Sequence, residues 1–208
     1  MKSTTFKLVE FFFIYFIIPL SYAIPYPWQA KLAIGFIGFF YVIFILLKVE
    51  NEKFKLASHL NWKLFWKRTA LKFVAIAILT TLFVSINSKE NLFEVFENKP
   101  KLWVIIVFIY ALFSVYPQEL IYRTLYFKRY EALFNNKSFF IFLNAIVFSL
   151  AHTFFRNGLV HVLTFLGGII FALTFNKTRS TVMVSIEHAI YGSWLFTVGM
   201  GSMLGFPS

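Results

Sequence analysis

The sequence predicts an all-α polytopic membrane protein, a single domain built as a bundle of about seven transmembrane helices. Of its 208 residues, 59% are apolar, 22% are aromatic and only 14% are charged. Soluble domains carry about a quarter charged residues. Thirty residues are Phe, and so much aromatic area on a water-exposed surface would cause aggregation. The apolar residues also gather in runs long enough to cross a bilayer.

The same composition excludes several other classes of protein. A chain without Cys is not a disulfide-bonded scaffold, and a chain this apolar is not disordered. Its net charge of +11 is typical of nucleic-acid binding in a soluble protein. In an apolar chain, however, Lys and Arg flank membrane spans, so we expect membrane lipid and no nucleic acid as a partner. No internal repeat or second domain is visible, so residues 1–208 form one membrane domain, with a core at 102–199 that carries the motifs.

Seven apolar runs approach the length of about 20 residues that crosses roughly 30 Å of hydrocarbon. They cover residues 8–23, 30–47, 71–86, 102–127, 138–155, 159–175 and 181–198. The first run has a basic start and a Ser-Tyr-Ala end, as a signal peptide does, but Glu10 lies within it, so we expect residues 1–23 to be retained. Residues 54–69 mix Trp, Leu and Phe with Lys and Arg. This pattern predicts an amphipathic helix that lies in the cytoplasmic membrane interface.

The basic residues predict the orientation. If the N-terminus is cytoplasmic, the inner segments hold 14 Lys and Arg and the outer segments hold five, while Arg123 lies within a span. Because basic residues accumulate in cytoplasmic loops, we expect a cytoplasmic N-terminus and an external C-terminus.

Ionisable residues are concentrated in the spans of the second half of the chain. Glu119 and Arg123 lie in the fourth run, His152 in the fifth, and Glu187 and His188 in the seventh. Such residues are costly in a membrane and are functional by default. Glu119 and Arg123 are four residues apart, so on a helix they share a face and can pair. Glu187 points away from the face of His188, and we expect it to serve packing.

Pro117 lies two residues before Glu119. Because proline removes a helical hydrogen bond and clashes with the preceding turn, we expect the fourth span to kink or restart there. A restarted helix would place unpaired backbone amides beside the carboxylate.

These residues form motifs that resemble those of the CPBP family, the CAAX prenyl endopeptidases and bacteriocin-processing proteins that are also called Abi proteins. The family pattern is Glu-Glu-x-x-x-Arg, Phe-x-x-x-His and His-x-x-x-Asn on separate membrane helices. The corresponding motifs in this sequence are Gln118-Glu119-x-x-x-Arg123, Phe148-x-x-x-His152 and His188 followed by small or polar residues. The match extends over about residues 115–199, and the surroundings of His188 resemble the bacterial branch. The resemblance therefore implies an integral protein of a bacterial inner or plasma membrane.

The resemblance also implies a glutamic intramembrane endopeptidase that hydrolyses a peptide or protein substrate. Gln118 replaces the first Glu of the family pair, so Glu119 takes the role of base and, with His152, activates water. His188 polarises the substrate carbonyl or holds the oxyanion. Arg123 orients Glu119, and Phe148 supports His152.

Gly192 stands where the family motif ends in Asn, so the resemblance gives the neighbouring Ser193 a supporting role beside His188. The two departures, at positions 118 and 192, also favour an alternative, which is a catalytically impaired membrane interaction or immunity protein on the same scaffold. A third class, a small transporter, is disfavoured because no repeat is detected.

We expect no metal or cofactor in the site. One Glu and two His could ligate zinc with an open position, and Glu119, His152 and His188 are the residues for this alternative. The sequence has no His-Glu-x-x-His helix, however, and a water-activating Glu needs no metal.

Overall fold

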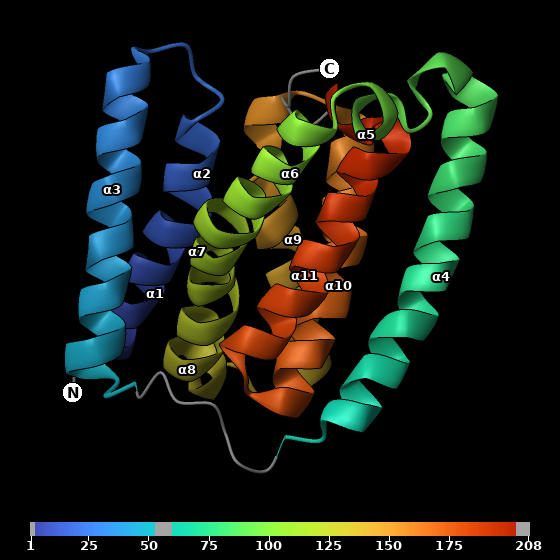
Figure 1. Ribbon diagram of the computed structural model, residues 1–208. Coiled ribbons are helices and arrows are strands. Elements are labelled where there is room, and N and C mark those ends of the chain that lie inside the picture. The colour runs from blue at the N-terminus through green and yellow to red at the C-terminus, as the bar shows by residue number, and fades with distance from the viewer. Residues whose placement is uncertain (1–2, 53–59, 203–208) are drawn as a thin grey trace. The chain divides into compact units, whose positions relative to one another are not determined.

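The computed structural model describes residues 3–52 and 60–202, and every regular element within them is a helix (Figure 1). The chain forms two compact units. The first unit takes the described residues of 1–55 together with 118–179, and the second takes those of 56–117 together with 180–208. Each unit thus joins two stretches that are separate in the sequence, and the chain passes from the second unit to the first between Pro117 and Gln118.

The first unit contains a helical hairpin, the second part of the fourth predicted span, and the fifth and sixth predicted spans. In the hairpin, the rod of α1, η1 and α2 runs beside that of α3 and η2 (Figure 1). The elements of the hairpin are α1 (Thr4–Phe12), η1 (Phe13–Ile17), α2 (Ile18–Ser21), α3 (Trp28–Phe44) and η2 (Ile45–Val49). The others are η5 (Leu120–Leu125), α8 (Tyr126–Tyr130), η6 (Glu131–Leu133), α9 (Lys137–Leu150), η7 (Thr153–Phe155) and α10 (Gly158–Thr178).

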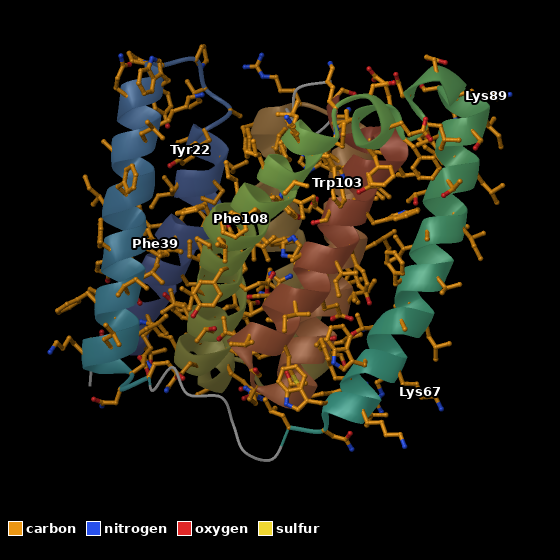
Figure 2. The ribbon with its side chains drawn as sticks, viewed as in Figure 1. Tyr22, Phe39, Lys67, Lys89, Trp103 and Phe108 are labelled. Atoms are coloured by element: carbon orange, nitrogen blue, oxygen red, sulfur yellow. The ribbon has the colours of Figure 1, made fainter. Side chains whose placement is uncertain are left out.

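The second unit is built on the long helix α4, with Lys67 near its start and Lys89 just past its end (Figure 2). Its elements are α4 (Trp62–Asn87), η3 (Lys89–Asn91), α5 (Glu94–Asn98), α6 (Pro100–Ile109), η4 (Tyr110–Val115), α11 (Thr181–Leu195) and η8 (Phe196–Met200). Two indole hydrogen bonds tie these elements together. Trp194 Nε1 donates to Thr80 Oγ1 over 2.9 Å, and Trp103 Nε1 donates to Thr197 Oγ1 over 2.8 Å. The short helix α7 (Tyr116–Glu119) contains the boundary between the units.

Short polar residues set where the helices begin. In the described part of the chain, five helices start after a residue whose side chain accepts a hydrogen bond from the first turn, which satisfies an otherwise unpaired amide. These residues are Ser3, Asn61, Asn136, Asn157 and Ser180. The helix α6 instead begins at Pro100, which needs no amide partner at that position.

Within residues 3–52 and 60–202, six helices are long and apolar enough to cross a membrane, and they overlap the first six predicted spans. They are Thr4–Ser21, Trp28–Val49, Trp62–Asn87, Pro100–Leu133, Lys137–Phe155 and Gly158–Thr178. The seventh predicted span is also helical, as α11 and η8, but Glu187 and His188 make it more polar than the other six. The expectation of an all-α polytopic bundle of about seven helices is therefore confirmed.

The prediction of a separate interfacial helix at 54–69 is wrong for residues 60–69, which the structure describes. Residues 54–59 lie outside the described part of the chain. From Trp62 onward the segment is the first part of α4, which continues without interruption to Asn87. No Pro or Gly separates the amphipathic start from the apolar run, and the Asn61 side chain caps the whole helix by accepting from the Leu64 amide over 2.9 Å.

Charged residues join three helix ends in the first unit. Glu10 of α1 pairs with Arg129 of α8, whose Nη1 atom also lies 2.6 Å from the carboxylate of Glu50, just after η2. The hydroxyl of Tyr130 donates to Glu10 Oε2 over 2.9 Å. The start of the first span, the end of the second and the end of the fourth thus meet on one side, as alternating spans require. Which side faces the cytoplasm stays a prediction from the basic residues.

Candidate functional site

Glu119 and Arg123 form a buried ion pair in the first unit. Arg123 Nε lies 3.4 Å from Glu119 Oε2, and both side chains are fully buried. The pair is the one that the four-residue spacing on a single helix predicts. A carboxylate and a guanidinium enclosed in protein interact more strongly than on a wet surface, so each holds the other in place.

The backbone that carries this pair is π-helical. The segment η4 ends at Val115, immediately before α7 and Pro117, and η5 begins at Leu120, immediately after Glu119. The amide of Tyr116 donates to the carbonyl of Ala111, five residues earlier. The predicted restart with unpaired amides at Pro117 is therefore not seen. The helix instead accommodates the proline by widening its turns, and π-helical turns often occur at functional sites.

Aromatic rings and a backbone carbonyl surround the guanidinium of Arg123. Its Cζ atom lies 4.3 Å from the ring centroid of Phe148 and 5.6 Å from that of Phe171. Its Nη2 atom lies 3.5 Å from the carbonyl oxygen of Gly168. Desolvated cation–π contacts contribute about 2 kcal/mol, so these contacts hold the guanidinium of Arg123 in position.

Gly168 lies where α10 packs closely against α9. A Cβ atom there would lie 2.9 Å from the Cα atom of Ala145. Because its carbonyl also contacts Arg123, this glycine takes part in both helix packing and the site. Small residues commonly allow such close packing between membrane helices.

His152 lies one helical turn beyond Phe148, at the end of α9. The helix ends at Leu150, and His152 directly precedes the short helix η7. Its Nδ1 atom lies 2.8 Å from the Phe148 carbonyl oxygen. Because a carbonyl only accepts hydrogen bonds, Nδ1 must carry the proton and Nε2 is the basic nitrogen of the neutral ring. The ring centroids of Phe148 and His152 lie 4.9 Å apart.

Phe148 therefore connects the two motifs of the first unit. It contacts Arg123 with its ring, and His152 with both its ring and its carbonyl group. Gln118, at the start of this unit, is half-buried and directly precedes Glu119. Four predicted site residues thus form one connected group: Glu119, Arg123, Phe148 and His152.

The remaining predicted residues, His188 and Ser193, lie on α11 and belong to the second unit. His188 is buried, and its ring meets that of Tyr110 edge-on with centroids 6.1 Å apart. Ser193 follows His188 by five residues, which on a helix with 3.6 residues per turn turns it away from the histidine face. Gly192, at four residues, shares that face.

Glu187 is fully buried and takes part in a separate polar cluster of the second unit. It pairs with Lys72 of α4, and the Tyr191 hydroxyl shares its one proton between two acceptors, Glu187 Oε1 at 2.9 Å and the Thr69 carbonyl oxygen at 3.1 Å. The cluster joins α4 to α11. This geometry agrees with the packing role expected for Glu187.

Three side chains beside the site were not predicted. Tyr15 and Asn144 donate hydrogen bonds to backbone carbonyls of η5, and Tyr110 contacts His188. Asn144 could have been found, because it lies four residues before Phe148 and is polar within a span. Tyr15 and Tyr110 have no such signal in a chain so rich in aromatic residues. Among the described residues, no three His or Glu side chains gather as a metal-binding group.

Comparison with known protein families finds a match for the second half of the chain. Residues 100–205 match the family described as type II CAAX prenyl endopeptidase Rce1-like. The match covers just over half of the chain and includes every predicted site residue, from Gln118 to Ser193. No match is found among curated proteins or solved structures.

Proposed function

Because the chain belongs to the type II CAAX prenyl endopeptidase Rce1-like family, we propose that it hydrolyses a peptide bond of a membrane-associated substrate with water activated by Glu119 and His152. The family and the apolar helices make it an integral membrane protein of a protease family. The observation that carries the proposal is the connected group in the first unit, in which a buried carboxylate, a fixed cation and an imidazole are linked through Phe148.

The proposed reaction follows from the chemistry of these groups. Glu119 accepts a proton from water with His152 assisting through Nε2, and the hydroxide attacks the scissile carbonyl carbon. His188 donates a hydrogen bond to the oxygen, which becomes negatively charged in the tetrahedral intermediate. When the C–N bond breaks, the proton held by Glu119 passes to the leaving amine. The products are a carboxylic acid and an amine.

The other predicted residues have supporting roles in this proposal. Arg123 orients the Glu119 carboxylate and does not react, because its guanidinium is held by aromatic rings and the Gly168 carbonyl. An amide cannot accept a proton at neutral pH, so Gln118 positions its neighbour and leaves the base role to Glu119. Ser193 has at most an indirect supporting role through α11, because it is turned away from the face of His188.

We also propose the setting of the reaction. The protein lies in a bacterial inner or plasma membrane, with a cytoplasmic N-terminus and an external C-terminus, and its partners are membrane lipid and a peptide or protein substrate. The basic residues support this orientation. The reaction as proposed uses no metal. Treatment with a zinc chelator should leave the cleavage rate unchanged, whereas loss of activity that added zinc restores would favour a site of Glu119, His152 and His188.

Two internally quenched peptides test the proposed function. Both end in a Cys followed by two aliphatic residues and a Ser, and only one carries a farnesyl group on the Cys. The purified protein in detergent micelles should cleave at least one of them, and the pair tells whether a prenyl group is required. Glu119→Gln and His152→Ala should each reduce kcat by at least about 100-fold.

Glu131→Gln is the matched control for Glu119→Gln, because it removes the same charge. Glu131 forms a surface ion pair with Arg179, with 2.7 Å between Arg179 Nη1 and Glu131 Oε2. This variant should keep wild-type activity. Cleavage at the wild-type rate by both Glu119→Gln and His152→Ala would overturn the assignment.

A second candidate function is a catalytically impaired interaction or immunity protein, favoured by Gln118 and Gly192 in place of Glu and Asn. It predicts that the wild-type protein cleaves neither peptide and that a cellular phenotype caused by the wild-type gene persists with Glu119→Gln. Loss of the phenotype with Glu119→Gln would exclude this function.

A further inference from the structure

The side chain of Tyr110 occupies the space in front of Gly192 in the second unit. A Cβ atom at position 192 would lie 1.9 Å from the Tyr110 hydroxyl oxygen and 2.5 Å from its Cζ atom. Real atoms do not approach this closely, so the hydroxyl lies where a side chain at position 192 would begin. The glycine is therefore needed for Tyr110 to take this position.

The same hydroxyl group lies on the helix face of His188. Gly192 follows His188 by four residues on α11, so both face the same direction. Tyr110, at the start of η4, meets the His188 ring edge-on, with centroids 6.1 Å apart. Tyr110 is half-buried and His188 is buried. A phenol from η4 and an imidazole from α11 thus lie side by side where these two helices of the second unit meet.

We propose that the Tyr110 hydroxyl is a catalytic hydrogen-bond donor that, together with His188, binds the oxygen of the scissile carbonyl. This inference rests on the proposed endopeptidase function. A neutral imidazole has one protonated nitrogen, so His188 alone supplies a single hydrogen-bond donor to the oxyanion. A phenol is a good second donor, and donors fixed in advance stabilise the charge that develops in the transition state.

The proposal explains why a glycine follows His188 at this spacing. A larger side chain at position 192 and the Tyr110 hydroxyl would occupy the same space. The second hydrogen-bond donor to the oxyanion can therefore come either from residue 192 of α11 or from η4, and in this chain Tyr110 of η4 supplies it. Ser193, one position further, faces away from His188 and its carbonyl accepts the Thr197 hydroxyl over 2.7 Å.

Exchanging the donor between the two helices tests the proposal. Tyr110→Phe keeps the ring and removes the hydroxyl. On whichever quenched peptide the wild type cleaves, this variant should lower kcat by about 100-fold. Its KM should change by less than about twofold, because the donor acts in the transition state. Tyr110→Ala should be equally impaired. Adding Gly192→Asn to Tyr110→Ala places an amide donor in the vacated space, and kcat should recover at least about tenfold.

The control is Tyr191→Phe on the same helix, which removes a hydroxyl that bonds Glu187 and Thr69. It should lower thermal stability in detergent and leave kcat within about twofold of the wild type. Wild-type kcat in Tyr110→Phe, with Glu119→Gln inactive, would overturn the role of Tyr110 alone. Impaired Tyr110→Ala without recovery in the double variant would also overturn it, because a merely structural tyrosine gives that result. Absence of cleavage by the wild type would overturn both the proposed function and this inference.

Discussion

The hydroxyl of Tyr15 donates a 2.7 Å hydrogen bond to the carbonyl oxygen of Ile121. The next carbonyl, that of Tyr122, accepts a 2.7 Å hydrogen bond from Asn144 Nδ2. Both donors are fully buried, and both carbonyls belong to η5. Side chains from η1 and α9 therefore hold two consecutive peptide groups of the π-helical turn between the two members of the buried ion pair. We infer that Tyr15 and Asn144 position Glu119 by fixing this turn.

The variant Tyr15→Phe tests this positioning role. Leaving the Ile121 carbonyl without its donor should cost about 1–3 kcal/mol of folding free energy. Because small displacements of catalytic groups reduce rates strongly, kcat should also fall by about tenfold. Peptide cleavage and unfolding in mixed detergent micelles measure the two effects separately.

The matched control for this prediction is Tyr126→Phe. Tyr126 is also fully buried and donates to a carbonyl, that of Phe140, over 2.9 Å. This bond joins α8 to α9 and does not involve η5. The control should lose similar stability but keep kcat per folded molecule. Equal kcat in the two variants would refute a positioning role for Tyr15.

The buried pair of Glu119 and Arg123 predicts non-additive stability. Arg123→Met removes the cation and leaves a buried carboxylate, which should destabilise the first unit by about 3–5 kcal/mol. The double variant Glu119→Gln/Arg123→Met should be more stable than Arg123→Met alone, because neither member then remains as an unpaired charge. Unfolding in mixed micelles provides the comparison. Destabilisation of the double variant by the sum of the two single effects would show that the side chains are not coupled.

The spans and the site motifs could be predicted from the sequence because their signals are local. A run of apolar residues fixes a span wherever it lies in the chain, and a charged residue within such a run is conspicuous. Glu119 and Arg123 share a helix, so their spacing alone predicts the pair. Phe148 and His152 are likewise joined by one helical turn and by the Nδ1–carbonyl contact.

The parts that could not be predicted depend on contacts between distant segments. Tyr15 and Ile121 are 106 positions apart, and a tyrosine in an aromatic run gives no sign of its partner. The prediction of a separate interfacial helix was wrong because an amphipathic pattern does not indicate whether a helix ends or continues into the next apolar run. At Pro117, the sequence shows that a hydrogen bond is lost but not that the backbone compensates with π-helical turns.

Two neighbouring residues on α8 should differ sharply in their contribution to stability. Arg129 is buried and binds both Glu10 and Glu50, whereas Lys128 is partly exposed and pairs with Glu52. Arg129→Met leaves the buried Glu10 without its cation and should cost about 3–5 kcal/mol. Lys128→Met removes a solvent-screened pair and should cost at most about 1 kcal/mol. Comparable losses in the two variants would contradict the buried network.

Gly168 should tolerate no side chain, because its Cβ atom would lie 2.9 Å from the backbone of Ala145. Gly168→Ala forces α9 and α10 apart and should destabilise the protein by about 1–3 kcal/mol. It also shifts the carbonyl that accepts from Arg123, so kcat should fall as well. Gly38→Ala on α3 is the control, since no atom lies within 4 Å of its Cβ position, and it should stabilise the helix by up to about 1 kcal/mol. Unfolding and peptide cleavage measured on both variants check the prediction, which fails if Gly168→Ala behaves like Gly38→Ala.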